Sequence, residues 1–314
     1  MRKLVGYRLL FAVPQLALVA VLAFSLTYLV PGSPAAEVLG ASATPELIAQ
    51  VEVQLGLDRP MPERLADWFG GALSGDLGVS YRSSLPVTDL LLDRLPATLS
   101  LVAGGLVVAV LIGIGMGVLA GVRPGSGRDR AVVGLTSIGN AVPEFWLGLV
   151  LMVVFAVQLG WFPVVGYVPL SEDPVAWLKG MVLPSLALGI GSSALIARQT
   201  RAGMVSSLAS PYIDALTAAG VPRRRIVLRY ALKNAMVPVL SATGITVNIL
   251  IGASFVLEKV FSVPGIGSLM LTSVVGKDFP VVQGGVLLVA CLVIVVNLLL
   301  DVGYGLLNPQ ARPQ

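Results

Sequence analysis

Long apolar runs without charge constrain this sequence more than any other feature. A helix that crosses the hydrocarbon core of a bilayer needs about 20 such residues. Six segments reach or approach that length, and only the third contains a charge, Glu144. Their ranges are 9–30, 97–122, 131–159, 181–197, 234–257 and 279–300, and Trp177 and Leu178 can extend the short fourth segment. The sequence therefore predicts an all-α, polytopic membrane protein with six transmembrane helices.

Composition excludes several classes of protein. Charged residues make up 12% of the 314 residues, whereas a soluble domain has about a quarter. There is no histidine, so the usual general base and metal ligand are missing. The single cysteine, Cys291, cannot form an intramolecular disulfide. We expect lipid contact, no metal site and no nucleic-acid partner, since basic residues collect on the cytoplasmic side of membrane proteins for other reasons.

The distribution of basic residues predicts the orientation. Six spans place both termini on one side, and most of the 21 Lys and Arg residues fall on that side. The positive-inside rule then makes both termini cytoplasmic. The first apolar run is longer than the core of a signal peptide, about 7–15 residues, and Ala41-Ser42-Ala43 lies well beyond its end. We therefore expect residues 9–30 to be retained as a span.

Two long connections define the predicted organisation. Residues 1–30 form the cytoplasmic N-terminus and first span, and residues 31–96 form an extracytoplasmic helical subdomain. Thr44 and Pro45 have the pattern of an N-cap followed by the first helical position. Residues 97–314 form the core with five spans, and a cytoplasmic segment of about 198–233 interrupts it.

Local rules divide the cytoplasmic segment into two short helices. Ser210 and Pro211 predict a helix start, followed by a helix over 212–219 that ends at Gly220. A second helix is expected from Pro222 to about residue 233. Ile213 and Leu216 share one face of the first helix, and Ile226 and Tyr230 share one face of the second. Two interpretations stay open: an amphipathic hairpin on lipid headgroups, or a knob that docks into another protein.

The same segment resembles a known motif. Residues 212–220 and 229–235 are similar to the EAA motif of ABC importer permeases, with Asp214, Ala215 and Gly220 at the acidic, alanine and glycine positions. Leu216 replaces a second alanine, and Lys233 stands where many permeases have proline. The resemblance implies a coupling helix in a cleft of an ATPase subunit. The coupling residues it implies are Tyr212, Asp214, Ala215, Leu216, Gly220, Arg223 and Arg224.

Further segments resemble the dipeptide and oligopeptide permeases of the B type. They are residues 31–34, 39–40, 43–46, 55–58, 75–78, 94–99, 261–267 and 278–284. The resemblance implies the type I ABC importer permease fold in a bacterial cytoplasmic membrane. It also implies a homologous second permease, two ATPase subunits inside and a substrate-binding protein outside. Peptide is the implied cargo, although relatives also move nickel chelates, glutathione, haem or oligosaccharides.

No catalytic residue is expected in this chain. A P-loop needs Gly-x-x-x-x-Gly-Lys-Ser/Thr, but Gly276-Lys277 is followed by Asp278 and has Leu271 at the first glycine position. ATP and magnesium are therefore expected in the partner ATPases, and no cofactor here. A secondary transporter is the alternative, but it predicts more charge within the spans and no docking hairpin.

Polar residues within the spans are the candidates for the substrate pathway. They are Glu144, Ser241, Thr243, Thr246 and Asn248. A polar group in hydrocarbon needs a partner or a water-filled cavity, so helix–helix hydrogen bonding is the alternative, and for Glu144 a place at a helix end near water. Tight helix packing is the favoured role of the glycines that crowd the second span, Gly105, Gly113, Gly115, Gly117 and Gly121.

Overall fold

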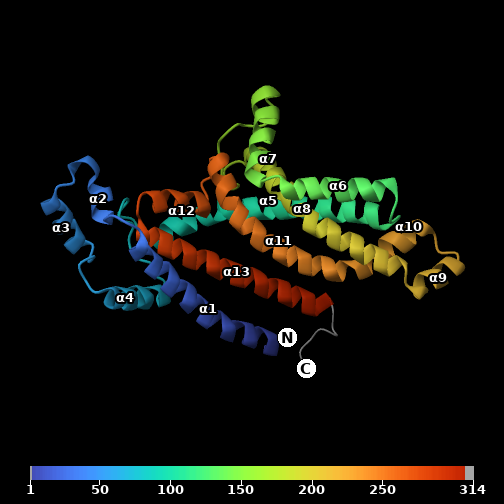
Figure 1. The fold of residues 1–314 in the computed structure, drawn as a ribbon, viewed down its shortest axis with the longest axis horizontal. Coiled ribbons are helices and arrows are strands. Elements are labelled where there is room, and N and C mark those ends of the chain that lie inside the picture. The colour runs from blue at the N-terminus through green and yellow to red at the C-terminus, as the bar shows by residue number, and fades with distance from the viewer. Residues whose placement is uncertain (1, 308–314) are drawn as a thin grey trace. The chain divides into compact units, whose positions relative to one another are not determined.

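The computed structural model describes residues 2–307, which are helical apart from loops and one antiparallel bridge between Val79 and Pro86 (Figure 1). Five of the described helices are long and apolar enough to cross a membrane, and a bent helix pair can form a sixth span. The all-helical polytopic fold predicted from the apolar runs is confirmed.

Most connections between the helices are short, and the two longest are residues 74–86 and 159–173. In chain order the helices are α1 (Arg2–Leu29), α2 (Pro34–Leu39), η1 (Gly40–Ser42), α3 (Pro45–Gln54), α4 (Met61–Leu73), α5 (Val87–Gly121), α6 (Gly127–Ala141), α7 (Glu144–Leu151), the π-helical η2 (Met152–Gln158), α8 (Pro174–Leu208), α9 (Pro211–Ala218), α10 (Arg223–Arg225), the π-helical η3 (Ile226–Ala231), α11 (Leu232–Val260), α12 (Ile266–Val275) and α13 (Phe279–Leu307).

Contacts divide the chain into two compact units. One comprises residues 98–263 and 296 onward, and the other comprises residues 2–97 and 264–295, so α5 and α13 each contribute to both. Helix α5 begins at Val87, well before the apolar run that starts at residue 97, and it contains Pro96. The charged residues Asp89, Asp93 and Arg94 lie before the apolar run and delay its start. They do not interrupt the helix, because charged side chains disfavour helical backbone only weakly.

The unit of residues 2–97 and 264–295 has its own apolar core. Val87, Leu91, Ile266 and Val281 are buried together. Thr44 caps α3, as predicted, and its hydroxyl oxygen accepts a 3.3 Å hydrogen bond from the Leu47 N–H.

A buried carboxylate fixes the turn of residues 79–86 in the same unit. Asp278 accepts hydrogen bonds from the Ser80 hydroxyl at 2.5 Å and from the Tyr81 N–H at 2.9 Å. Asp278 and Ser80 are both 3% exposed.

The other unit is built around α8, which is its most buried long helix. Glycines of α5 lie against α8, and a Cβ at Gly105, Gly113 or Gly121 would approach Leu188, Ile196 or Met204 to within 2.9 Å. The contacted residues of α8 advance in step with the glycines, so the two helices run parallel in register. The predicted packing role is confirmed for these glycines and for Gly117, but it is wrong for Gly115, which has nothing within 4 Å of an added Cβ.

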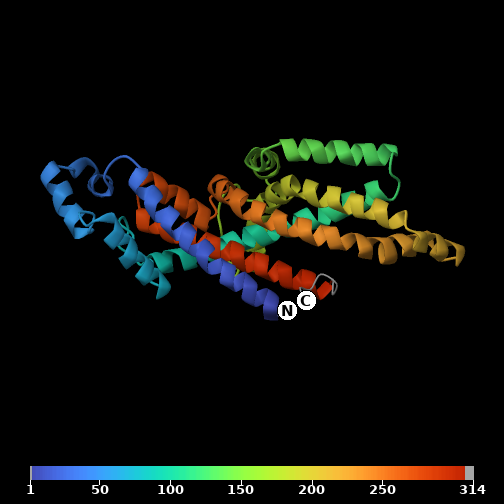
Figure 2. The same cartoon turned by 60° about the horizontal axis from the view of Figure 1, so that its bottom comes forward.

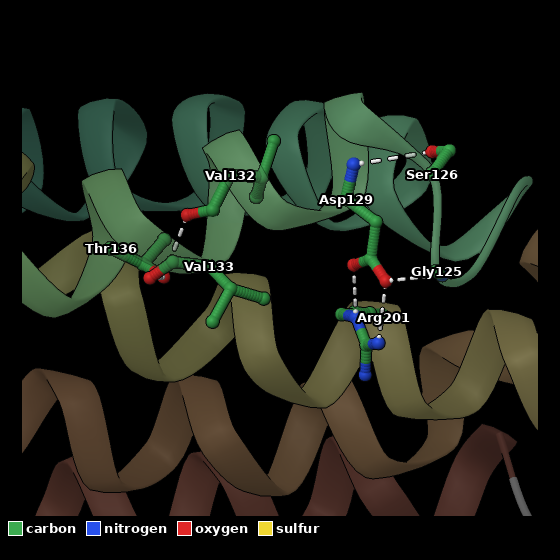
Figure 3. A network of polar contacts seen from close by, with 7 residues as sticks. All are labelled: Gly125, Ser126, Asp129, Val132, Val133, Thr136 and Arg201. Carbon is green, nitrogen blue, oxygen red and sulfur yellow. Dashed lines mark hydrogen bonds and ion pairs between the residues drawn. The ribbon is translucent and has the colours of Figure 1, made fainter.

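Helices α11 and α6 cover other sides of α8 (Figure 2). A cluster of Met204, Val227, Ala231 and Ala235 joins α8 to the beginning of α11. Helix α6 has only two buried residues, Asp129 and Thr136. The Asp129 carboxylate binds the Arg201 guanidinium of α8, while the Thr136 hydroxyl donates to carbonyls of α6 itself (Figure 3).

Candidate functional site

The predicted coupling segment folds into a short helix with a sharp end. Helix α9 begins at Pro211 after Ser210 in extended conformation, and it ends at Ala218, close to the predicted range. Gly220 has φ +76°, a left-handed conformation that favours glycine because an L side chain is strained there. The corner predicted at Gly220 is therefore confirmed.

The prediction of a second short helix ending near residue 233 is wrong. The chain is helical without interruption from Arg223 to Val260, with the π-helical η3 near its beginning. Lys233 and Asn234 end the apolar pattern, but neither ends a helix. The corner at Gly220 therefore leads into the long helix of the fifth span, which begins at Arg223.

Lipid headgroups and another protein are the two contacts that the sequence leaves open for this segment, but part of its apolar face is buried within the chain. Ile213 and Ile226 are 2% and 1% exposed, and α9 packs on η3 within the chain. Leu216 is half-buried. Of the coupling residues that the resemblance implies, Asp214, Ala215, Gly220, Arg223 and Arg224 are exposed, and Tyr212 is 37% exposed.

Tyr212 anchors α9 to its two neighbouring helices. Its hydroxyl lies 2.8 Å from Ser207 Oγ on α8 and accepts a 2.8 Å hydrogen bond from Asn234 Nδ2 on α11. The sequence placed Tyr212 in the motif but gave no partner for its hydroxyl. One hydroxyl therefore links α9 to both α8 and α11.

Glu144 lies at the break of the bent helix pair. Helices α6 and α7–η2 are inclined by 97° at Val142 and Pro143, and Glu144 is the first residue of α7. Its half-buried side chain lies over Gly191 of α8, where an added Cβ would come 2.8 Å from Glu144 Cγ. The position is a helix end, and the absence of a side chain at Gly191 provides the space for the carboxylate.

The other pathway candidates differ in their contacts. Ser241 is exposed. The hydroxyls of Thr243 and Thr246 donate to carbonyls one turn earlier in α11, at 2.9 Å each. Asn248 Nδ2 donates to Asn297 Oδ1 on α13 at 3.2 Å, while Asn248 Oδ1 is buried without a partner.

A buried carboxylate at the end of α11 was not among the residues predicted from the sequence. Glu258 is fully buried and accepts a 2.6 Å hydrogen bond from the Thr98 hydroxyl on α5. The apolar run ends at residue 257, yet the helix continues to Val260. A charge one residue beyond an apolar segment was the available signal. No group of three His, Cys, Asp or Glu residues in the range 2–307 could hold a metal ion.

Family models and curated relatives that match nearly the whole chain are membrane components of transport systems. The family described as binding-protein-dependent transport system inner membrane component matches residues 113–313, and the N-terminal region of such membrane components matches residues 1–102. A putative peptide transport system permease protein of Brucella abortus (strain 2308) is 36% identical over 312 residues, 99% of each chain. The dipeptide transport system permease protein DppB of Escherichia coli (strain K12) is 36% identical over 97% of each chain.

A solved structure shares the fold. A chain of the MetNI methionine ABC transporter in an inward facing conformation superimposes with a TM-score of 0.58 and 22% identity, covering 70% of this chain and 96% of that chain. At this identity the likeness shows the fold alone.

Proposed function

The chain belongs to the family of binding-protein-dependent transport system inner membrane components, and we propose that its cargo is dipeptides or oligopeptides. The observation that carries this proposal is similarity over nearly the full length to relatives named as peptide and dipeptide permeases. Nickel chelates, glutathione, haem and oligosaccharides are the alternative cargoes within the same class of importer.

In this proposal the chain pairs with a homologous second permease, and the two form the route for the peptide. Two ATPase subunits bind on the cytoplasmic side and hold ATP and magnesium, so this chain is not catalytic. A substrate-binding protein delivers the cargo on the other side. Both termini lie in the cytoplasm of a bacterial cell.

The coupling step falls to α9. Its exposed residues Asp214 and Ala215 enter a cleft of the ATPase, and Arg223 and Arg224 contact the rim of that cleft. The support is geometric: Gly220 makes the corner, and Tyr212 links α9 to two long helices. A displacement of the ATPase is passed to these helices because the hydroxyl contacts leave little freedom between them.

The substrate route runs along α7 and α11. Glu144, Ser241, Thr243 and Asn248 are its polar lining in this proposal. The half-exposed carboxylate of Glu144 offers a contact for the cationic groups of a peptide.

The test is reconstitution of the chain with its partner permease, the ATPases and the binding protein in liposomes. We expect labelled dipeptide to accumulate only when ATP is present on the side of the membrane that carries the ATPases. This accumulation should persist when a protonophore is added. Accumulation driven by an ion gradient without ATP would instead identify a secondary transporter. ATP-dependent uptake of one of the alternative cargoes, without peptide uptake, would refute peptide as the cargo.

A further inference from the structure

The ion pair between Asp129 and Arg201 is a two-point contact between α6 and α8. Arg201 Nε lies 2.5 Å from Asp129 Oδ1, and Arg201 Nη2 lies 2.8 Å from Asp129 Oδ2 (Figure 3). The Asp129 side chain is 5% exposed and the Arg201 side chain 34%. A planar guanidinium that binds both oxygens of a carboxylate fixes orientation as well as distance.

Asp129 also organises the beginning of α6. Its Oδ2 accepts a 2.8 Å hydrogen bond from the Gly125 N–H, and its own N–H donates to Ser126 Oγ at 3.3 Å. The connection between α5 and α6 and the first turn of α6 therefore share one carboxylate with α8.

Helix α6 lies along α8, but few of its residues are buried. Asp129 and Thr136 are its only buried residues. Thr136 and Ser137 donate their hydroxyls to carbonyls of α6 itself. Helix α6 thus has little buried apolar surface of its own, and the ion pair is its principal polar attachment to α8 among the contacts of residues 2–307.

Arg201 lies on the part of α8 that leads to the coupling helix. Helix α8 continues without a break to Leu208, and α9 begins at Pro211. Around Arg201 the packing is tight, because a Cβ at Gly203 would lie 3.0 Å from Ala235 of α11.

We propose that Arg201 is a positioning residue that makes α6, and with it the bend before Glu144, follow the cytoplasmic end of α8 when α9 is displaced. This rests on the proposed function. The chain of contacts runs from α9 through α8 to Asp129, along α6 to the bend at Pro143, and so to Glu144. Movement at the ATPase then reaches the pathway through α6 as well as through α11.

Three variants and a control test the proposal in the reconstituted importer. The single variants are Arg201→Lys, which keeps the charge but loses the two-point contact, and Asp129→Asn, which removes the negative charge. The third variant exchanges the pair, Asp129→Arg with Arg201→Asp. The control is Arg198→Gln, at an exposed arginine on the same helix. The measured quantity is peptide imported per ATP hydrolysed. We expect each single variant to lower this ratio about tenfold, a size typical of one coupling contact, while ATP hydrolysis continues. The exchanged pair should recover only part of the loss, because an arginine at position 129 can bind an aspartate at position 201 but cannot accept the Gly125 N–H. Arg198→Gln should match wild type.

A distance measurement keeps the proposal testable if a variant does not assemble. Spin labels at Gly134 on α6 and Ala202 on α8, both exposed, are placed in the otherwise wild-type importer with Cys291→Ala. The distance should be the same without nucleotide and in the vanadate-trapped state. A distance that changes between these states, or single variants with an unchanged import ratio, would overturn the proposal. Failure of the wild-type importer to take up peptide would instead count against the proposed function.

Discussion

The side-chain amide of Asn234 donates a 2.8 Å hydrogen bond to the hydroxyl oxygen of Tyr212, which joins α9 to the helix of the fifth span. The same hydroxyl lies 2.8 Å from Ser207 Oγ at the end of the preceding long helix. One phenol hydroxyl thus contacts both long helices next to α9.

Removing this hydroxyl should weaken coupling without preventing assembly. Tyr212→Phe keeps the ring but loses both contacts, at about 1 kcal/mol each. We expect the ATPases to copurify normally, while peptide uptake per ATP falls severalfold. The control is Thr217→Val, because the Thr217 hydroxyl bonds only within α9, to the Ile213 carbonyl. Equal uptake ratios in the two variants would rule out the anchoring role of Tyr212.

Larger side chains at the Gly220 corner and on the exposed face of α9 should impair ATPase binding or transport. Gly220→Val places a branched side chain at φ +76°, a strain of roughly 1–3 kcal/mol, and Ala215→Trp fills the exposed face. Both should lose ATPase copurification or transport, while the protein still inserts. Matched controls are Gly160→Val, at φ +64° with nothing near an added Cβ, and Ala202→Trp on the exposed side of α8. Normal ATPase binding and uptake by both coupling variants would show that α9 is not the coupling element.

The orientation of the chain can be tested by labelling cysteines in cells. In a Cys291→Ala background, Ser83→Cys should react with an impermeant thiol reagent added outside, whereas Arg128→Cys should react only after permeabilisation. Both positions are exposed, so access to the reagent is decided by the membrane. The reverse pattern would invert the topology.

Glu144→Gln should discriminate between cargoes. The amide keeps the size of the side chain over Gly191, so folding should be unaffected, but the charge is lost. We expect uptake of lysine-containing dipeptides to fall more than uptake of neutral dipeptides. Glu172→Gln, at an exposed acidic residue of the following loop, is the control. If the two variants treat cationic and neutral peptides alike, the carboxylate of Glu144 has no role in cargo selection.

The sequence predicted helix locations better than helix ends. Apolar runs identify the spans because the bilayer demands them, and Gly220 marks its corner through backbone sterics. Residues such as Asp93 and Lys233 change the apolar pattern without changing backbone preference, so α5 and α11 extend beyond the runs. Glu258 was missed for the same reason.

Contacts between distant segments could not be predicted from one sequence. The pairs Asp129–Arg201 and Thr98–Glu258 depend on which helix faces lie together, and one sequence does not show which faces meet. The burial of Ile213 likewise depends on the packing of α9 on η3. The glycines of the second span are different, because residues spaced by four share a helix face.

That spacing separates Gly115 from its neighbours and gives a sharp test of the packing of α5 on α8. A Cβ at Gly113 would lie 2.7 Å from Ile196 Cβ and 2.9 Å from the Ser193 carbonyl oxygen, whereas a Cβ at Gly115 meets nothing within 4 Å. Gly113→Ala should therefore push the helices apart at a cost of about 1–3 kcal/mol, as overpacking does in other well-packed cores. Gly115→Ala makes the same chemical change two residues away and should leave stability unchanged or slightly raised. Thermal unfolding of the detergent-purified permease pair measures both, and a lower Tm for Gly113→Ala alone is the expected result. Equal Tm values would mean that α5 and α8 are not packed in the register described.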